Sequence, residues 1–358
     1  MATFYSLIVK DIRKETSDCV SVAFDVPEEL KDTFSFTQGQ YLTLRTHING
    51  EEVRRSYSIC NSPLDQELRV AVKQVPEGLF STFANKELEV GDRLEAMPPM
   101  GKFFTPLHPE NRKNYIAFAA GSGITPIMSI MKSILLEETN SSFTLFYGNK
   151  YASSVIFKEQ IEGLKNTFLD RLRVFHFFSR EQSDIPLFQG RIDGEKCGHI
   201  FDKLVDLHEV DDVFLCGPEE MIFAAKKELE DRGMDHKKIH FELFTTAAGK
   251  KRVKRTPTDQ SKQDDCEVFI KDGGNSFGFN LPFDTENILD AALSRGADLP
   301  YACKGGVCCT CKAKIIEGEV EMEVNYALEP EEVEAGFVLT CQAFPKTAKV
   351  IVDYDEAL

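Results

Sequence analysis

Short hydrophobic stretches separated by turns fill the first hundred positions of the chain. These stretches are rich in β-branched and aromatic residues, and glycine, asparagine, proline and charged residues separate them, which is typical of antiparallel strands that close into a barrel. A turn at 99–103 and a polar segment at 106–113 end the pattern. We therefore expect a barrel domain over 1–109. Its predicted elements are strands at 4–12, 19–26, 41–44, 55–59 and 68–75 and a helix that follows residue 78 and runs through 88.

Beyond residue 110 the pattern changes to strands that alternate with helices. Short apolar runs, each ending at a turn, are followed by segments with helical spacing, and this alternation favours a parallel sheet. The sequence thus predicts a second, α/β domain over 110–247. Its expected strands lie at 115–120, 144–147, 173–178 and 212–216, and its expected helices at 127–138, 155–164 and 219–232.

A polar segment over 248–265 separates this domain from the last part of the chain. Its composition of Lys, Arg, Asp, Gln, Ser and Pro cannot bury enough apolar surface to fold, so we interpret it as a flexible, solvated linker. The third domain is expected over 266–358, with strands at 267–270, 276–281 and 313–318 and a helix at 287–295. The fold class is therefore multidomain, α/β plus β.

Composition and charge limit the functions that this chain can have. Its 358 residues, 42% apolar and 28% charged, describe a soluble globular protein of two or three domains, and no apolar stretch is long enough to cross a membrane. The net charge of −16 argues against nucleic-acid partners. Ten cysteines and no secretory leader at the N-terminus predict a reducing, cytoplasmic location where thiolates serve metals and redox chemistry.

Four cysteines near the C-terminus have the spacing of an iron–sulfur site. Cys303, Cys308 and Cys311 follow the pattern C-x4-C-x2-C, and Cys341 is the distant fourth, as in plant-type [2Fe-2S] clusters. Gly305 and Gly306 suit a loop that wraps closely around such a group. The sequence therefore predicts these four thiolates as cluster ligands.

A zinc site or disulfide bonds would account for the cysteines less well. A structural zinc site more usually shows two C-x2-C pairs or added histidines, and disulfides require an oxidising compartment. Cys309 does not fit the cluster spacing, and a free cysteine is more often a small buried hydrophobe than a ligand. We therefore interpret Cys309 as a non-ligand.

Two stretches of the predicted barrel could hold a phosphate and a planar ring. Arg55 and Tyr57 lie on one face of a strand, and Ser58 follows them. Further on, Lys73 precedes a glycine and a serine, Gly78 and Ser81, at the N-terminus of a helix, where free N–H groups suit pyrophosphate. Each stretch alone also has an ordinary structural role, because surface strands carry such residues and a serine there can simply cap the helix.

The second domain contains a phosphate-binding turn of strand–glycine–helix type. Gly121 and Gly123 follow the first strand, and Thr125 and Pro126 lead into the helix, an order that points a helix N-terminus at phosphate. Pro126 departs from the usual G-x-G-x-x-G pattern.

Three residues at the predicted carboxyl end of the sheet favour NADPH over NADH. Ser179 and Arg180 follow one strand and Arg191 lies after a later turn, and arginine at this edge suits a ribose 2′-phosphate. Either arginine could instead be a solvated loop cation. Cys216, at the tip of another strand before Gly217 and Pro218, is either a buried thiol or a group beside the nicotinamide.

Taken in order along the chain, these motifs resemble the ferredoxin–NADP reductase family with a fused plant-type ferredoxin domain. The resemblance covers essentially the whole chain. It implies an antiparallel barrel that binds FAD, a nicotinamide domain, and a β-grasp ferredoxin domain that passes electrons outward. The motifs are Arg55-x-Tyr57-Ser58, Gly78-x-x-Ser81, Gly121-x-Gly123-x-Thr125-Pro126, Cys216-Gly217-Pro218 and the four cysteines.

The family also implies roles for individual residues. Arg55, Gly78 and Ser81 would hold the flavin pyrophosphate, Tyr57 would lie against the isoalloxazine ring, and Ser58 would lie near its reactive nitrogen. Ser58, Cys216 and Phe244 would thus be the residues nearest the hydride transfer. Glu242 and Phe244 match a Glu-x-aromatic ending of the nicotinamide domain. Family members have Tyr at the aromatic position, whereas this chain has Phe there and continues beyond it.

A finer resemblance connects the cysteine region with the reductase subunits of phenylacetyl-CoA epoxidases, which are multicomponent di-iron oxygenases. It includes the stretches 301–311, 317–322, 325–326 and 338–342. The implied activity is electron transfer from NADPH, or NADH, through FAD and the [2Fe-2S] cluster to an oxygenase in phenylacetate catabolism. Two alternatives stay open: a general NAD(P)H:ferredoxin-type or stress-linked reductase, and a non-enzymatic electron carrier or binding module. Glutamates at 317–323 and 329–334 could steer a basic partner or serve solubility alone.

Overall fold

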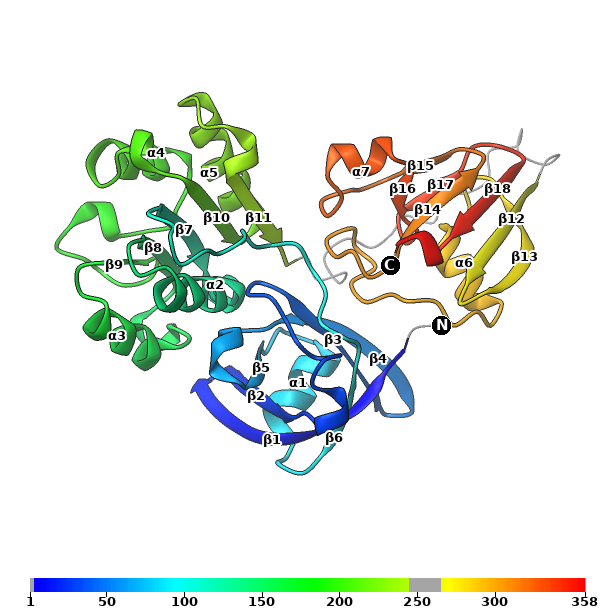
Figure 1. Ribbon diagram of the computed structural model, residues 1–358, viewed down its shortest axis with the longest axis horizontal. Coiled ribbons are helices and arrows are strands. Elements are labelled where there is room, and N and C mark those ends of the chain that lie inside the picture. Colours follow the sequence, from blue (N-terminus) through cyan, green and yellow to red (C-terminus); the bar gives the residue numbers. More distant parts are fainter. Residues whose placement is uncertain (1–2, 245–264, 358) are drawn as a thin grey trace. The chain divides into compact units, whose positions relative to one another are not determined.

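The computed structural model describes residues 3–244 and 265–357, and the chain divides into two compact units (Figure 1). The first unit is Tyr5–Phe244 and contains two sheets; the second contains the described residues from Asp265 onward. The predicted linker at 248–265 lies outside the described residues except for Asp265, which begins a strand. No helix in the described ranges is long and apolar enough to cross a membrane.

The first sheet is an antiparallel barrel, as predicted. Its strand order is β4-β3-β6-β1-β2-β5, and a bridge between Ile59 and Val70, next to a hydrogen bond from Cys60 N–H to the Arg69 carbonyl at 2.9 Å, joins its two edges. The elements are β1 (Tyr5–Thr16), β2 (Cys19–Asp25), β3 (Tyr41–Ile48), β4 (Glu51–Ser58), β5 (Leu68–Lys73), α1 (Leu79–Lys86) and β6 (Arg93–Ala96).

The second sheet is parallel, in the order β11-β10-β7-β8-β9. Tyr115 and Ala117 pack into a core shared with α2 and α3, whereas Phe118, one position along, stacks on Phe146 and contacts Phe201 of α4, so helices cover both faces. The elements are β7 (Asn114–Ala120), α2 (Ile124–Glu137), β8 (Ser142–Asn149), α3 (Lys158–Thr167), β9 (Leu172–Phe178), α4 (Gly194–Lys203), β10 (Asp212–Gly217), α5 (Glu219–Asp231) and β11 (Ile239–Leu243).

Several predicted boundaries were wrong. Helix α2 begins at Ile124 instead of residue 127, because Pro126 fits the first helical turn, where its missing N–H would have no partner. Helix α3 begins at Lys158 instead of 155, because Phe157 before it adopts the left-handed conformation (φ 60°). The elements β6, α4 and β11 had no counterpart among those predicted from the sequence.

Helix α2 is attached to the barrel by hydroxyl groups. Ser129 Oγ donates to the Asn61 carbonyl at 2.7 Å, and Ser133 Oγ donates to Ser62 Oγ at 2.8 Å. These four residues are buried, so each bond replaces water that was lost on folding. The contact fixes the start of α2, and the glycine turn before it, against the barrel.

A buried carboxylate anchors the segment at 106–113 between the two sheets. Glu138 is fully buried and accepts hydrogen bonds from His108 N–H, Asn111 Nδ2, the Tyr115 hydroxyl and Ser141 Oγ, at 3.2, 2.6, 2.9 and 2.7 Å. A carboxylate that is removed from water needs hydrogen-bond donors of this number to replace its lost hydration. The segment that the sequence marked only as polar is therefore held in place.

The second unit is a mixed sheet in the order β13-β12-β18-β14-β16, with a separate β15-β17 pair. Strands β12 and β18 run parallel while the other neighbours are antiparallel, and α6 contributes Ile288, Leu289, Ala291 and Ala292 to the core, the β-grasp arrangement. The elements are β12 (Asp265–Asp272), β13 (Asn275–Pro282), α6 (Ile288–Ser294), β14 (Lys312–Glu317), β15 (Val320–Met322), α7 (Pro330–Glu334), β16 (Phe337–Leu339), β17 (Ala343–Pro345) and β18 (Lys349–Asp353).

Candidate functional site

A cavity of about 860 Å³ opens at the carboxyl ends of the parallel strands, the edge where open α/β sheets bind ligands. It gathers residues from the tips of β7, β8, β9 and β10. Nine residues predicted to bind a cofactor or to lie near hydride transfer line it: Lys73, Gly121, Gly123, Ser179, Arg180, Arg191, Gly217, Pro218 and Phe244.

The glycine turn at the start of α2 has room for a ligand because it lies directly against β10. A Cβ on Gly123 would be 2.1 Å from the Cys216 carbonyl oxygen, and one on Gly217 would be 3.2 Å from the backbone nitrogen of Ala120. Only glycine permits this approach. Gly121, Ser122 and Gly123, the residues of the turn before this fourteen-residue helix, therefore line the cavity, a position that suits a pyrophosphate.

Two of the predicted turn residues do not line the cavity. Thr125 and Pro126 are buried in the first turn of α2, and Thr125 Oγ1 donates to the Ser122 carbonyl at 3.0 Å. Their contribution is to close the turn. Lys73, which the sequence grouped with the flavin motifs, reaches this cavity from β5, with Nζ 3.9 Å from the place that a Cβ on Gly121 would occupy.

Ser58, Cys216 and Glu242 come together between the barrel and the parallel sheet. Ser58 Oγ donates to Glu242 Oε2 at 3.2 Å, and Glu242 pairs with Cys216 across β10 and β11. Desolvation raises the pKa of Glu242 to about 8. Burial, with the Glu242 carboxylate nearby, raises the pKa of Cys216 well above its ordinary value, so this thiol is neutral.

The barrel side of the site contains the predicted flavin residues. The Tyr57 ring lies against Phe80 of α1, with centroids 5.3 Å apart, and Arg55 Nη1 donates to the Arg54 carbonyl at 2.7 Å. Ser81 Oγ accepts from Val75 N–H and donates to the Gly78 carbonyl, both at 3.2 Å. The Ser81 hydroxyl thus shapes the turn, and the N–H groups of α1 supply the donors that face outward from it.

The four predicted ligand cysteines form two pairs. Cys308 Sγ donates to Cys303 Sγ at 3.1 Å, and this bond lowers the pKa of Cys303 to about 6, while Cys311 lowers the pKa of Cys341 in the same way. The pKa of Cys308 rises well above its ordinary value because its proton is held in the bond to Cys303 and because the thiol is buried. The loop between α6 and β14 and the turn between β16 and β17 bring these pairs to one end of the unit.

These cysteines fit a [2Fe-2S] cluster by their donor chemistry. Gly305 N–H donates to Cys303 Sγ at 3.3 Å and Gln342 Nε2 to Cys341 Sγ at 3.6 Å, which stabilises thiolate charge. Each iron of such a cluster takes two thiolates, and the chain offers two pairs. No group of three His, Cys, Asp or Glu residues in the described ranges has metal-site geometry.

Cys309 is turned to other partners. Its thiol donates to the Ala327 carbonyl at 3.3 Å and packs against the core of the second unit. The interpretation of Cys309 as a non-ligand stays a prediction that this geometry favours.

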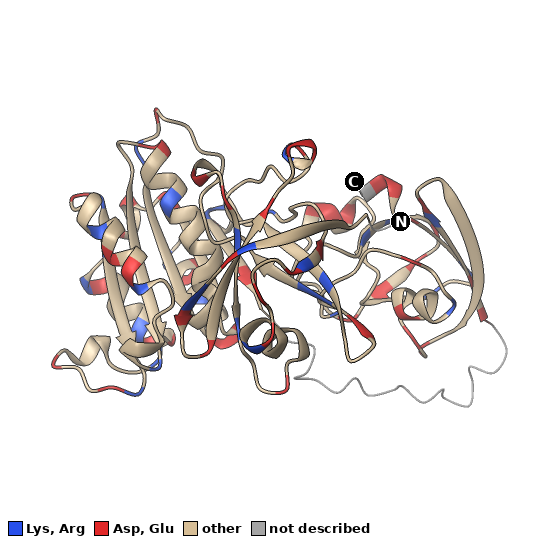
Figure 2. Cartoon of the chain, turned by 90° about the horizontal axis from the view of Figure 1, so that it is seen from below, with Lys and Arg blue, Asp and Glu red and all other residues tan. Residues whose placement is uncertain are grey.

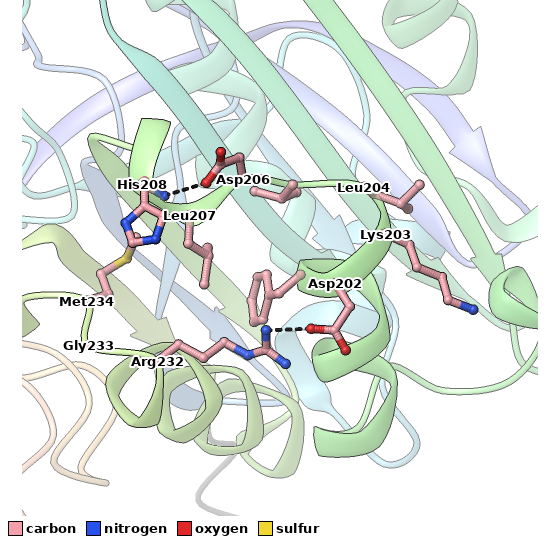
Figure 3. Close-up of a pocket in the computed structure, with 11 residues that line it drawn as sticks. Asp202, Lys203, Leu204, Asp206, Leu207, His208, Arg232, Gly233 and Met234 are labelled. Atoms are coloured by element: carbon pink, nitrogen blue, oxygen red, sulfur yellow. Dashed lines mark hydrogen bonds and ion pairs between the residues drawn. The ribbon is translucent and has the colours of Figure 1, made fainter.

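A second hollow, of about 600 Å³, lies at the opposite end of the parallel sheet (Figure 3). It is formed where α4 leads into β10 and α5 into β11. Its arginine, Arg232, is already paired with Asp202 at 2.7 Å and Glu228 at 2.9 Å. The hollow is remote from the glycine turn, and none of the predicted site residues lines it.

Three regions of the chain match known domain families. Residues 6–105 match the oxidoreductase FAD-binding domain, 118–227 the oxidoreductase NAD-binding domain, and 271–346 the 2Fe-2S iron-sulfur cluster binding domain. Over 355 residues the chain is 45% identical to one of the subunits of 1,2-phenylacetyl-CoA epoxidase from Escherichia coli (strain K12), covering 99% of both. The chain belongs to the ferredoxin–NADP reductase family with a fused 2Fe-2S domain.

Other members of this family are similar over nearly the whole length. The ferredoxin reductase component of 3-ketosteroid-9-alpha-monooxygenase from Rhodococcus rhodochrous is 32% identical, covering 97% of this chain and 96% of the relative. Phthalate dioxygenase reductase has the same fold, with a TM-score of 0.59, 22% identity and 98% of both chains covered. The chain is therefore an oxidoreductase with FAD, NAD and 2Fe-2S domains, and a zinc module or a non-enzymatic carrier is not the correct interpretation.

The residues at the site that were absent from the predicted set include Glu242, Asn149 and Lys150. The sequence marks Glu242 only by its place in a Glu-x-aromatic ending, because nothing local connects it with Ser58, 184 positions earlier. Asn149 and Lys150 line the cavity from the tip of β8. Their position directly after a predicted strand was the available signal, since ligand contacts gather at strand carboxyl ends.

Proposed function

We propose that this chain is an NADPH-dependent reductase that supplies electrons to a multicomponent oxygenase of the phenylacetyl-CoA epoxidase kind. The 45% identity to one of the subunits of that epoxidase, over nearly the full length, supports the terminal acceptor. The observation that supports NADPH is the charge of the cavity, whose lining contains four cations, Lys73, Lys150, Arg180 and Arg191, and two carboxylates, Asp193 and Glu220. Lys73 also pairs with Asp18, at 3.8 Å.

This local excess of cations is unusual for the chain. Asp and Glu outnumber Lys and Arg by 58 to 42, and carboxylates are spread over both units (Figure 2). A cavity that reverses the sign of the surrounding protein concentrates anionic ligands. This effect should strengthen the binding of NADPH more than that of NADH, because NADPH carries an additional phosphate.

When bound, FAD accepts a hydride and releases its electrons singly, and the cluster carries one electron at a time. The residues of this chain hold and orient the groups. The Gly121–Gly123 turn and the α2 N-terminus bind the nicotinamide dinucleotide pyrophosphate, while Arg55, Tyr57 and the turn from Gly78 to Ser81 hold the flavin. Cys303, Cys308, Cys311 and Cys341 ligate the irons.

Ser58, Cys216, Glu242 and Phe244 shape the place where nicotinamide meets flavin. Ser58 and Glu242 share a hydrogen bond, so a proton can be held between hydroxyl and carboxyl beside the ring system. Phe244 is 40% exposed and lines the cavity directly after β11, where an aromatic ring can cover the flavin until nicotinamide displaces it. Cys216, kept neutral by burial, packs under the turn.

The terminal acceptor is tested by reconstitution. The purified reductase is mixed with the oxygenase subunits of a phenylacetyl-CoA epoxidase, and thioester product and NADPH consumption are measured together. We expect product formation to match NADPH consumption. Rapid reduction of ferredoxin or cytochrome c together with uncoupled NADPH consumption in the presence of the oxygenase would favour the general acceptor reductase instead.

A cytoplasmic location accompanies this proposal, because NADPH and coenzyme A thioesters would be met there. The acidic stretch of α7 and its surroundings, with Glu329, Glu331 and Glu334, offers the oxygenase a surface for electrostatic steering. Coupled turnover that falls steeply with ionic strength would support this surface.

A further inference from the structure

A side-chain amide lies between the two chain segments that supply the predicted cluster ligands. Gln342 directly follows Cys341 in the turn between β16 and β17 and is buried, with 5% of its surface exposed. The other three ligands lie on the loop between α6 and β14. Gln342 Nε2 donates to Cys341 Sγ at 3.6 Å and to the Lys304 carbonyl of that loop at 3.1 Å. One amide group therefore joins the fourth ligand to the loop of the other three.

The chemistry of the two neighbours determines which end of the Gln342 amide faces them. The Lys304 carbonyl oxygen only accepts hydrogen bonds, and so does the sulfur of a thiolate. The amide nitrogen carries two hydrogens, and the two bonds use one each. In the reverse orientation the amide oxygen would face two acceptors, so the nitrogen must point towards the sulfur of a ligating Cys341.

Backbone hydrogen bonds hold Gln342 itself in place. Its N–H donates to the Leu339 carbonyl at 2.8 Å, and its carbonyl accepts from Glu323 N–H at 3.0 Å. Its side chain then runs along the ligand loop, because a Cβ on Gly306 would be 3.2 Å from Gln342 Cγ and 2.9 Å from the Val324 carbonyl oxygen. The stem of Gln342 thus packs against a loop position that has no side chain.

The loop residue that accepts from Gln342 has an uncommon backbone conformation. Lys304 has φ 50°, in the left-handed region, which is unfavourable for a residue with a side chain unless its surroundings hold it. Its ammonium group pairs with Asp290 of α6 at 2.9 Å and lies over the Tyr301 ring, 4.5 Å from the centroid. Lys304 is therefore held through its side chain by α6 and through its carbonyl by Gln342.

Other donors reach the predicted ligands from within the loop. Gly305 N–H donates to Cys303 Sγ at 3.3 Å, and the side chain of Thr310 bonds to that of Cys308. These contacts connect residues that are already close in sequence. Gln342 differs from them because its second bond reaches a residue 38 positions away, so it couples two separate segments.

A hydrogen bond to a ligand sulfur affects the reduction of a cluster. Reduction adds one electron and no proton, and part of the added negative charge lies on the ligand sulfurs. A donor that points at sulfur is attracted more strongly by the more negative, reduced form. Such a bond therefore raises the reduction potential of the cluster.

We infer that Gln342 is a positioning residue of the [2Fe-2S] site, which holds the Cys341 turn to the ligand loop and raises the reduction potential of the cluster by donating to the Cys341 sulfur. The inference rests on the proposed function, since it requires that the four cysteines ligate a cluster that receives electrons from the flavin. Within that function, Gln342 makes the cluster a better acceptor for those electrons.

The test is a potentiometric titration of the holoprotein with dithionite, followed by the paramagnetic signal of the reduced cluster. Gln342→Met keeps the length of the side chain and removes both N–H donors. The equilibrium constant for one-electron reduction of its cluster should fall about tenfold, which corresponds to about 59 mV. The effect is limited to this size because the bond is present in both oxidation states and only the difference in its strength counts. An unchanged potential would overturn the inference.

Asn325→Ala is the matched control. Asn325 also lies near the ligand loop, since Tyr326 N–H donates to the Gly306 carbonyl at 3.0 Å, but its Nδ2 donates to the Leu328 carbonyl, at 3.0 Å. Its loss should lower the melting temperature of the second unit and leave the potential of the cluster unchanged. An equal fall in potential in both variants would show that any loosening near the loop has this effect, and the role of the sulfur bond would be wrong.

A second variant covers the case in which Gln342→Met assembles no cluster. Gln342→Asn keeps the amide but draws it back by one methylene group, so the 3.6 Å bond to sulfur is lost. Its cluster should have a lower potential than that of the wild type. A wild-type potential in Gln342→Asn would overturn the inference.

Failure of the proposed function looks different. A wild-type protein that binds no iron and gives no paramagnetic signal after reduction would contradict the proposed function itself. A wild-type protein with a reducible cluster, together with an unchanged potential in Gln342→Met, would leave the proposed function intact, and only the role of Gln342 would be wrong.

Discussion

Replacing Gly123 with alanine tests whether the glycine turn really lies against β10. The residue has an ordinary helical backbone (φ −60°), so alanine brings no conformational strain, and the effect is purely steric. Its Cβ would be 2.1 Å from the Cys216 carbonyl oxygen, 2.5 Å from the Cys216 carbonyl carbon and 2.8 Å from the Gly217 nitrogen. All three atoms are backbone, so no side chain can rotate away.

The magnitude follows from these contacts. Heavy atoms rest at roughly 3.5 Å, so the two turns must separate by more than about 1 Å. Overpacking of this kind costs about 1–3 kcal/mol, and we expect the upper end because backbone must move. At about 2–4 °C per kcal/mol for a unit of this size, the melting temperature of the first unit should fall by roughly 6–12 °C.

Thermal unfolding followed by flavin fluorescence measures this change, and steady-state kinetics measure KM for NADPH, which should rise because the turn that binds pyrophosphate has moved. Gly163→Ala is the matched control. Gly163 is an exposed residue of α3 with nothing within 4 Å of its Cβ position, and alanine in a helix should stabilise by about 1 kcal/mol. A Gly123→Ala protein with the melting temperature and KM of the wild type would refute the close contact between the glycine turn and β10.

Three other changes give distinct outcomes. Cys309→Ser should keep the visible absorption and iron content of the cluster, because its thiol faces the Ala327 carbonyl; loss of iron would show that the ligand set is wrong. Glu138→Gln should destabilise the first unit by about 1–3 kcal/mol in chemical denaturation, because an amide nitrogen replaces one of the two oxygens that accept from four donors, and an unchanged free energy of unfolding would contradict the network. The pKa of Glu242 is about 8 in the folded protein and about 4.5 in the unfolded chain, so between these values the folded protein binds one more proton. The stability of the wild type should therefore fall relative to that of Glu242→Gln as pH rises from 5 to 8, by at most about 1.4 kcal/mol per pH unit. Parallel pH profiles of the two melting temperatures would show that the carboxyl is not desolvated.

The sequence predicts the layers of the fold because hydrophobic periodicity reports which face of an element is buried. The short apolar runs at 115–120 and 144–147, each followed by a helical pattern, predict strands of a parallel sheet, and the structure has them as β7 and β8. Boundaries were less accurate where one residue's backbone decides, as at Phe157, whose left-handed conformation no hydrophobic pattern indicates.

Site residues that belong to local motifs could be predicted, and those that depend on distant contacts could not. Gly121 and Gly123 define a turn within a few positions. The bond between Ser58 and Glu242 joins the barrel to the last strand of the parallel sheet, so it exists only after both have folded. Asn149 and Lys150 line the cavity, and the sequence shows only that they follow a predicted strand, not that this strand ends at the cavity.

Anaerobic reduction of the purified protein by NADPH tests the central claim most directly. Flavin absorbance should bleach on mixing, and the paramagnetic signal of the reduced cluster should follow it. A Cys341→Ser variant, which lacks a predicted iron ligand, should still bleach its flavin without giving that signal. A wild-type flavin that stays oxidised under NADPH, or a cluster signal that appears as fast in flavin-free protein, would contradict the proposed path.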